Sequence, residues 1–178
     1  NHKSDYLRAY LLNKYGGGYH DIKYREKNWK NAWNDDNWLQ NKDIWMYCRR
    51  EKQPEDIGYP PGMKHIQNEY KKLGTMGWII SKPDTPYTNE LLSGIHEVLD
   101  NKYEQLKKYP AKNPGGYWQM NAVPRPKNSY PLRWLEIMGE IFHPLMLKYT
   151  KHIKFGLPDA EGLAYKYTAD YMQDTIDT

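Results

Sequence analysis

Residues 4–24, SDYLRAYLLNKYGGGYHDIKY, run from a helical pattern through three consecutive glycines to an aspartate. Ser4 suits the N-cap of a helix, and aromatic and apolar residues then recur at helical spacing, which predicts a helix over residues 5–15. Glycine takes the left-handed conformation without strain, so the three glycines predict a helix end and a tight reversal. The following residues, 19–24, indicate a short strand that carries Asp21 near its end.

Further along the chain, short strand-like runs alternate with helical patterns. The predicted strands cover residues 44–49 and 76–81, and the predicted helices cover residues 65–73, 88–109 and 132–149, the last with a break near Pro144. Residues 25–41 are rich in tryptophan and predict a short helix or an irregular segment, while residues 110–131 hold five prolines and predict a long loop. Strands that alternate with helices predict an α/β sandwich.

The composition bounds the size and the environment of the protein. A chain of 178 residues and 21.3 kDa predicts one domain, in which 7 Trp and 17 Tyr supply apolar area despite a mean hydropathy of −1.01. Cys48 stands alone, which excludes an intramolecular disulfide and indicates a reducing compartment, the cytoplasm. No run of 18 apolar residues occurs, so no membrane span is predicted, but a role at a membrane surface stays open. Because the chain begins without a methionine, we expect its first elements to lie upstream.

The order SDxLR followed by YGGGYxD within residues 4–21 resembles the signature of sugar-nucleotide glycosyltransferases of the GT-A fold that carry a DXD sequence. The similarity is to the family 32 type and to capsular polysaccharide synthesis proteins in particular. Two later segments are similar more loosely. MGWIISKP at residues 76–83 resembles the strand that passes beside the sugar, and YPLRWLEIMGEIFHP at residues 130–144 resembles an acceptor-side segment of a subset that includes virus-encoded relatives.

This resemblance implies a fold and an activity. The implied fold is a GT-A-like sandwich around a mostly parallel central sheet, with its first strand or strands missing from this chain, and residues 1–178 then form a single glycosyltransferase catalytic domain. The implied enzyme moves a hexose or a deoxyhexose from a nucleoside diphosphate donor to a hydroxyl of a glycan or glycoprotein. UDP is the expected nucleotide, and a viral or microbial surface glycan is the expected product, made in the host cytoplasm in the viral case.

The resemblance also implies a donor site near the start of the chain. The residues expected to bind the donor sugar and its nucleotide are Ser4, Asp5, Arg8, Gly17, Gly18, Asp21 and Lys23. Asp5 and Arg8 are three residues apart, so they share one helix face and can point together into a cleft. Asp21 corresponds to the first acid of the DXD pair, which in the family holds Mn²⁺ or Mg²⁺ against the diphosphate.

Lys23 occupies the position of the second acid of that pair. Two explanations stay open. Either Asp21 holds the metal together with a ligand from elsewhere, such as His143, or Lys23 itself supplies part of the positive charge. His143 has a simpler alternative, a histidine packed inside a helix end. On residue types alone, Asp21 is equally well explained as a solvated acid at a strand end, since junctions of helix, glycine and strand are common.

Further catalytic and acceptor-binding residues are expected in the second half of the chain. Besides Asp21, the candidate catalytic residues are Glu136 and Glu140, which are one helical turn apart and could present a base to an acceptor hydroxyl. A solvated helix face is the alternative for both glutamates. The residues expected to bind the acceptor, by stacking of sugars on aromatic rings and by charge, are Trp118, Arg133 and Trp134.

Two other classes of function stay open. The lysine in place of the second acid is compatible with a carbohydrate-binding domain or a degenerate transferase that lacks activity. The net charge of +4 and the many aromatic residues would also suit a module that binds single-stranded nucleic acid. The basic residues are scattered among acids, however, so nucleic acid is not an expected partner. The expected partners are a nucleotide-sugar donor and a glycan or glycoprotein acceptor.

Overall fold

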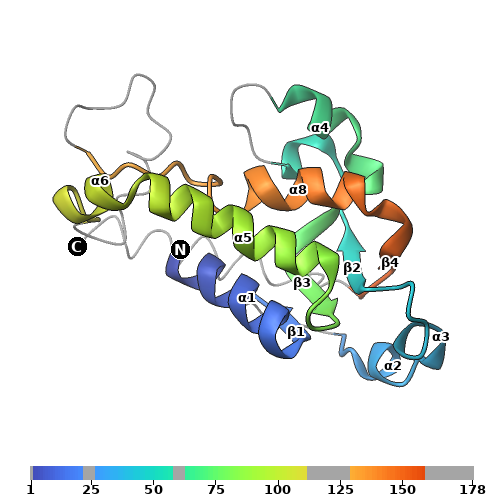
Figure 1. Ribbon diagram of the computed structural model, residues 1–178. Coiled ribbons are helices and arrows are strands. Elements are labelled where there is room, and N and C mark those ends of the chain that lie inside the picture. The colour runs from blue at the N-terminus through green and yellow to red at the C-terminus, as the bar shows by residue number, and fades with distance from the viewer. Residues whose placement is uncertain (1, 22–26, 58–62, 112–128, 159–178) are drawn as a thin grey trace.

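The computed structural model describes residues 2–21, 27–57, 63–111 and 129–158, in which a four-stranded sheet carries helices on both faces (Figure 1). The strands are β1 (Gly17–His20), β2 (Met46–Arg50), β3 (Gly74–Ser81) and β4 (Ile153–Phe155). The α-helices are α1 (His2–Tyr15), α2 (Lys30–Trp33), α3 (Asp36–Leu39), α4 (Lys64–Asn68), α5 (Pro86–Asn101), α6 (Tyr103–Lys108) and α8 (Gly139–Lys148). Short 3-10 helices are η1 (Pro54–Asp56), η2 (Tyr70–Lys72) and η4 (Thr150–His152). The α/β class is therefore confirmed.

The sheet is mixed, so the prediction of a mostly parallel sheet is wrong. Its strands lie in the order β1-β3-β2-β4, with β3 antiparallel to both β1 and β2, and β4 parallel to β2. Parallel neighbours need a crossover of a dozen or more residues, usually a helix that covers a sheet face. The helices described between β2 and β3 have five residues or fewer. Because they do not act as a crossover, β3 returns antiparallel beside β2.

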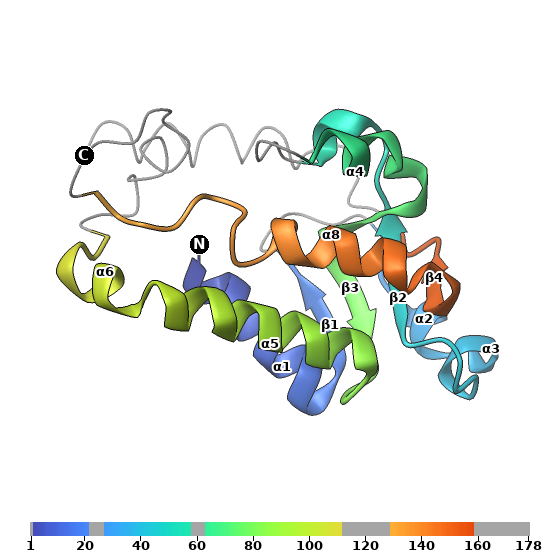
Figure 2. The same cartoon turned by 45° about the horizontal axis from the view of Figure 1, so that its top comes forward.

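Two clusters of buried side chains hold the layers together. On one face of the sheet α5 and α8 lie across β2 and β3 with α1 beside α5 (Figure 2), and the large cluster there includes Leu12, Ile79, Ile95, Phe142 and Met146. On the other face α2 and α3 contribute to a smaller cluster that consists of Trp29, Ala32, Trp38, Trp78, Ile80 and Leu157. The alternation of side chains along β3 thus fills both clusters. The segment predicted to be a short helix or irregular forms the short helices α2 and α3, and Trp29 and Trp38 anchor it in the smaller cluster, whereas Trp33 is exposed.

The predicted helices differ in detail from those observed. Residues 65–73 form α4 and the 3-10 helix η2, and residues 132–138, which precede α8, are not helical. The helix predicted over residues 88–109 divides at Lys102 into α5 and α6. The break predicted near Pro144 is absent, and α8 continues through this residue. A proline removes one backbone donor from a helix, and the buried side chains of Phe142 and Met146 on either side of it hold both halves of α8 against the sheet.

The glycines end α1, as the sequence predicts. The N–H of Gly16 donates to the carbonyl of Leu12 at 3.0 Å, and the φ angles of Gly16 and Gly17 are 66° and 95°. A Cβ atom on Gly16 would lie 2.7 Å from Cδ of Pro83 and 2.8 Å from the carbonyl oxygen of Ser81. The reversal from α1 into β1 therefore requires a residue without a side chain at this point.

Substitution of Gly16 by alanine is expected to lower the free energy of unfolding by about 2–4 kcal/mol, because it combines backbone strain with a steric clash. Gly17→Ala is the matched control. It adds similar backbone strain, but a Cβ atom there meets nothing within 4 Å, so a loss of about 1–2 kcal/mol is expected. Urea unfolding followed by circular dichroism measures both, and equal losses would contradict the steric argument.

Candidate functional site

Arg8 is the centre of a polar cluster between α1, β1 and β3. Its side chain is 6% exposed, and its Nη1 donates to the carbonyl oxygen of Met76 in β3 at 2.7 Å. Its Nη2 donates to the carboxylate of Asp5, and Nη1 lies 3.9 Å from Oδ1 of Asp21. The guanidinium also stacks over the ring of Tyr19, 4.5 Å from its centroid. The structure thus brings Asp5, Arg8 and Asp21 together.

Asp21 is held at the end of β1 by its neighbours. The hydroxyl of Tyr19 donates to Oδ1 of Asp21 at 3.0 Å and lies 3.3 Å from Oγ of Ser4. The backbone N–H of Asp21 donates to the carbonyl of Gly77 at 3.0 Å. The carboxylate also rests above Gly77, where a Cβ atom would lie 2.9 Å from Oδ2. We call Ser4, Asp5, Arg8, Tyr19 and Asp21 the Arg8 cluster.

The local sequence explains this convergence. Asp5 and Arg8 are three residues apart on α1 and so share a face. Tyr19 and Asp21 are two residues apart along β1 and its end, and side chains at that spacing point to the same side of a sheet. The glycine reversal turns β1 back along α1, so the two pairs meet. Asp21 is one-third exposed, at 33%, and is the carboxylate that the cluster presents to solvent.

The electrostatics of the Arg8 cluster follow from its burial. Burial raises the pKa of the Asp5 carboxyl, and the adjacent Arg8 guanidinium opposes this shift. Burial likewise raises the pKa of the Tyr19 hydroxyl, which therefore stays protonated and can donate to Asp21. Among the described residues, Nε of Arg8 is buried without a hydrogen-bond acceptor. The cluster therefore holds one buried cation against two carboxylates.

The remaining donor-site candidates are placed differently. Gly18 packs against the smaller cluster, since a Cβ atom on it would lie 3.1 Å from the rings of both Trp29 and Trp33. Gly17 contributes its backbone conformation to the reversal. Lys23 lies outside the described residues. Gly17 and Gly18 thus shape the approach to Asp21, and their expected contact with a donor stays a prediction.

Glu136 and Glu140 are both engaged in ion pairs. Nζ of Lys102 lies 2.5 Å from Oε1 of Glu136, whose Oε2 accepts from the backbone N–H of Arg133 at 2.8 Å. Burial by itself would raise the pKa of Glu136, but Lys102 and Arg133 outweigh it, so the pKa is lowered. Glu140 accepts two hydrogen bonds from the Arg133 guanidinium, one of them at 3.0 Å. The lowered pKa makes Glu136 a weaker base, and the proposed catalytic role of both glutamates stays a prediction.

The acceptor-side candidates lie next to the first turn of α1. Nε2 of His2 is 3.0 Å from the carbonyl oxygen of Arg133 and 3.2 Å from that of Trp134, and its Nδ1 is 2.9 Å from the hydroxyl of Tyr130. Trp118 and most of the loop predicted over residues 110–131 lie outside the described residues. The structure therefore brings Arg133 and Trp134 to the same end of α1 as Ser4 and Asp5.

His143 is a packed histidine, the simpler of its two interpretations. It is 1% exposed and hydrogen-bonded to the Gly74 backbone, with Oε1 of Glu51 at 4.0 Å from its Nε2. Asp21 lies at Gly77, three residues further along β3, which is about 10 Å at the rise of a strand. The two are thus not brought together as ligands of one ion. Within the described residues, no group of three His, Cys, Asp or Glu side chains could hold a metal.

Sequence reasoning did not identify several residues of this site. Tyr19 could have been found from strand alternation, because it lies two positions before Asp21. The Met76 carbonyl, Gly77 and His2 could not, since each acts through contact with residues far away in the chain.

Comparison of the chain with protein-family models, with curated proteins and with solved structures found no match. In the segments that the structure describes, none of the helices combines the length and the apolar character that a membrane crossing needs.

The burial of His143 makes stability depend on pH. Burial lowers its pKa from 6.5 to about 4, so the unfolded chain binds a proton more readily than the folded one. The resulting stabilisation is complete above pH 6.5 and falls by about 3 kcal/mol as the pH drops towards 4. His143→Gln keeps a donor for Gly74 but does not titrate. We expect urea unfolding between pH 4 and 6.5 to show a shallower loss of stability for this variant, and parallel pH curves would contradict the assignment.

Proposed function

We propose that the chain is a glycosyltransferase that moves a hexose or deoxyhexose from a nucleoside diphosphate donor, UDP first among the candidates, to a hydroxyl of a glycan or glycoprotein. The observation that supports the proposal is the convergence of Asp5, Arg8 and Asp21 on one point between α1, β1 and β3. These are three of the seven residues that the resemblance to GT-A enzymes assigns to the donor. A cytoplasmic location and a viral or microbial glycan product belong to the same proposal.

The cluster has the groups that such a reaction needs. Departure of a diphosphate concentrates negative charge, and a fixed cation in a poorly solvated site stabilises that charge without reorganisation. Arg8 supplies such a cation, held in place by Met76 and Asp5. The one-third exposed carboxylate of Asp21 can accept hydrogen bonds from sugar hydroxyls, and the Tyr19 hydroxyl fixes its orientation.

The Arg8 cluster can bind a metal ion together with the phosphates of the donor. Mg²⁺ in nucleotide sites usually keeps several waters and is bound through one or two carboxylates plus substrate phosphates. Asp21, one-third exposed, can serve as that carboxylate, whereas no preformed group of three ligands is found in the described residues. We therefore propose that Mn²⁺ or Mg²⁺ enters with the diphosphate, where it would neutralise charge on the leaving group.

The pairing of both glutamates favours a second candidate function, a degenerate transferase that binds a nucleotide sugar without turning it over. Glu136 and Glu140 were the predicted bases, and each is held by a cation. Such a domain would share the donor site and differ only in the absence of transfer. Binding and turnover must therefore be measured separately.

Thermal shift with UDP, GDP, UDP-sugars and Mn²⁺ tests the donor site. A ligand at a hundred times its Kd stabilises by about 2.7 kcal/mol, which is about 5–10 °C in Tm for a chain of this size. We expect such a shift with a nucleoside diphosphate and Mn²⁺ together, and little shift with Mn²⁺ alone. Asp21→Asn should abolish the metal-dependent part and lower transfer about 100-fold or more, while Asp36→Asn, at an exposed site on α3, should change neither.

The outcomes of this panel separate the proposals. A shift without transfer supports the degenerate transferase. The absence of any shift with nucleotides, or an Asp21→Asn variant with full turnover, overturns the donor site. Activity that is unchanged in EDTA contradicts the proposed metal ion and leaves the proposed donor site in place.

Gly77→Ala tests the position of the Asp21 carboxylate without removing a polar group. A Cβ atom at this position would lie 2.9 Å from Oδ2 of Asp21, so the carboxylate must move. We expect about tenfold weaker nucleotide-sugar binding, measured by calorimetry. Gly94→Ala is the matched control, because its Cβ would meet only the side chain of Ile141 on α8. Equal effects on binding would show that Asp21 is not positioned through Gly77.

A further inference from the structure

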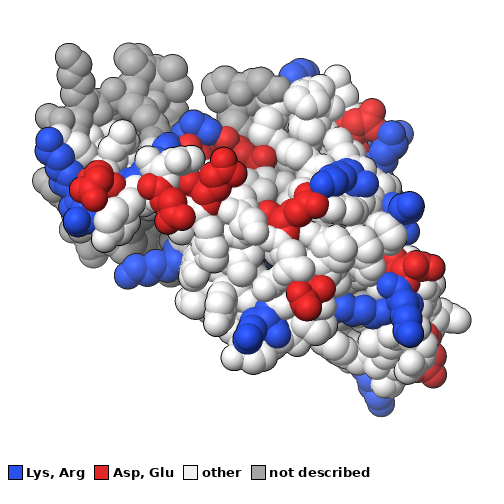
Figure 3. All heavy atoms as spheres, in the orientation of Figure 1, with Lys and Arg blue, Asp and Glu red and all other residues white. Residues whose placement is uncertain are grey.

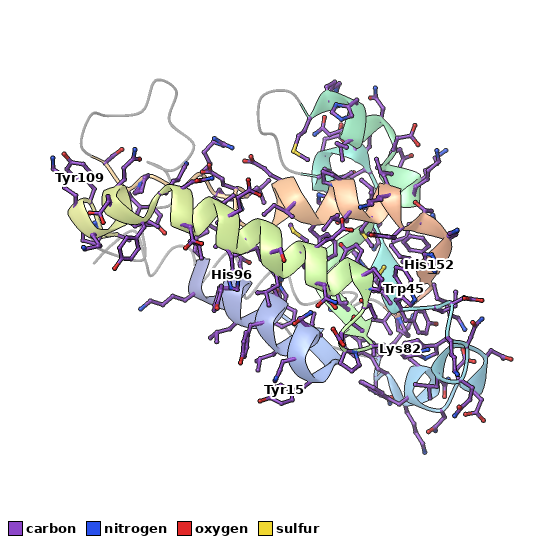
Figure 4. The ribbon with its side chains drawn as sticks, in the orientation of Figure 1. Tyr15, Trp45, Lys82, His96, Tyr109 and His152 are labelled. Atoms are coloured by element: carbon purple, nitrogen blue, oxygen red, sulfur yellow. The ribbon has the colours of Figure 1, made fainter. Side chains whose placement is uncertain are left out.

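The outward face of α1 carries leucines and tyrosines flanked by lysines. The exposed residues of α1 are Lys3, Ser4, Leu7, Tyr10, Leu11, Lys14 and Tyr15, and no acid is among them. Leu7, Leu11 and Tyr15 are 53%, 47% and 68% exposed, and their spacing of four residues aligns them along the helix. Figure 4 shows Tyr15 at the end of α1 pointing away from the rest of the protein.

This face marks an interaction site. The inner side of α1 is already packed against the protein, with Ala9 and Leu12 in the large cluster and Arg8 in the Arg8 cluster. Clustered exposed apolar side chains on the other side signal a protein or membrane contact. The outer leucines of α1 therefore indicate that another molecule binds to this face.

We propose that the outer face of α1 docks on an anionic lipid surface. Leucines that enter the acyl boundary, tyrosines at headgroup level and lysines that reach anionic headgroups are the composition of helices that lie in a membrane interface. α1 packs against α5 and β1 on its inner side, so only its outer face can meet a lipid surface. The helix therefore lies in the plane of the surface.

The distribution of charge favours a lipid surface over a second copy of the chain. If α1 packed against α1 of another copy, lysines would face lysines in either direction, since Lys3 and Lys14 flank the leucines near both ends. The exposed face of α1 has no acid to compensate them, whereas anionic headgroups attract both. Figure 3 shows a mostly white surface over α1 with blue at its edges, and red gathered over α5. An anionic surface would thus attract α1 and repel α5, which sets the orientation.

The docked face borders the Arg8 cluster. Ser4 belongs to the exposed side of α1, and its Oγ lies 3.3 Å from the Tyr19 hydroxyl that bonds to Asp21. Docking through α1 would place the cluster beside the lipid headgroups. One consequence, which rests on the proposed transferase while the docking itself does not, is that the acceptor is a glycan carried on a lipid.

Flotation of the chain with phosphatidylcholine vesicles, with and without phosphatidylglycerol, tests the docking. We expect binding to the anionic vesicles that weakens as salt is raised. The double variant Leu7→Gln, Leu11→Gln should lose vesicle affinity by a factor of about ten or more. The double variant Lys3→Gln, Lys14→Gln should lose about fivefold per lysine on anionic vesicles alone. Tyr103→Gln, at a site on α6 that is 56% exposed, should bind as the unchanged chain does.

The controls keep the docking separate from folding and from catalysis. We expect the circular dichroism spectrum and the nucleotide thermal shift of all three variants to match those of the unchanged chain. None of the substituted side chains belongs to the large cluster or to the Arg8 cluster. Failure of the unchanged chain to bind anionic vesicles, or equal binding by the leucine variant, overturns the proposal. So does a dimer in sedimentation that the leucine variant dissociates, since a second copy is then the occupant. Vesicle binding without a nucleotide shift leaves the docking in place and overturns the transferase.

Discussion

A single buried guanidinium ties the first helix to the sheet. Arg8 is 6% exposed, and it bonds to a backbone carbonyl of β3 and to Asp5 on its own helix, with Asp21 3.9 Å away. Breaking a buried ion pair by removal of one partner is strongly destabilising. The positions of α1, β1 and β3 are therefore limited to those in which the three acceptors reach Arg8, and the candidate site is the place where they do so.

Two glycines make that approach sterically possible. Gly16 lets the chain reverse against Pro83 and Ser81, and Gly77 leaves room above β3 for the carboxylate of Asp21. A side chain at either position would push β1 or its acid away from Arg8. The lack of a side chain at Gly16 therefore permits the chain reversal, and the lack of one at Gly77 permits the Asp21 carboxylate to approach Arg8.

The local part of this arrangement could be predicted from the sequence, and the long-range part could not. The end of α1 at the glycines and the shared face of Asp5 and Arg8 depend on residues a few positions apart, so the pattern contains them. The predicted N-cap at Ser4 is wrong, because α1 already begins at His2. The direction of β3 and the Met76 carbonyl depend on a contact between residues 68 apart in the chain. Hydrophobic periodicity indicates which residues form strands but not which strands pair. The α/β class was therefore predicted correctly, and the strand directions were not.

The inward position of Arg8 determines which side of α1 faces the protein and which side faces solvent. The apolar and aromatic residues that reveal the helix in the sequence, such as Leu7, Leu11 and Tyr15, recur on its outer side, while Arg8, Ala9 and Leu12 face inward. Apolar periodicity alone would have turned the helix the other way. The carbonyl and the two carboxylates around Arg8 outweigh that pattern, because a buried cation with good partners is tolerated and one without them is not. By holding Arg8 inward, the cluster leaves the leucines outward, so the candidate site and the proposed lipid-docking face are two results of the same rotation of one helix.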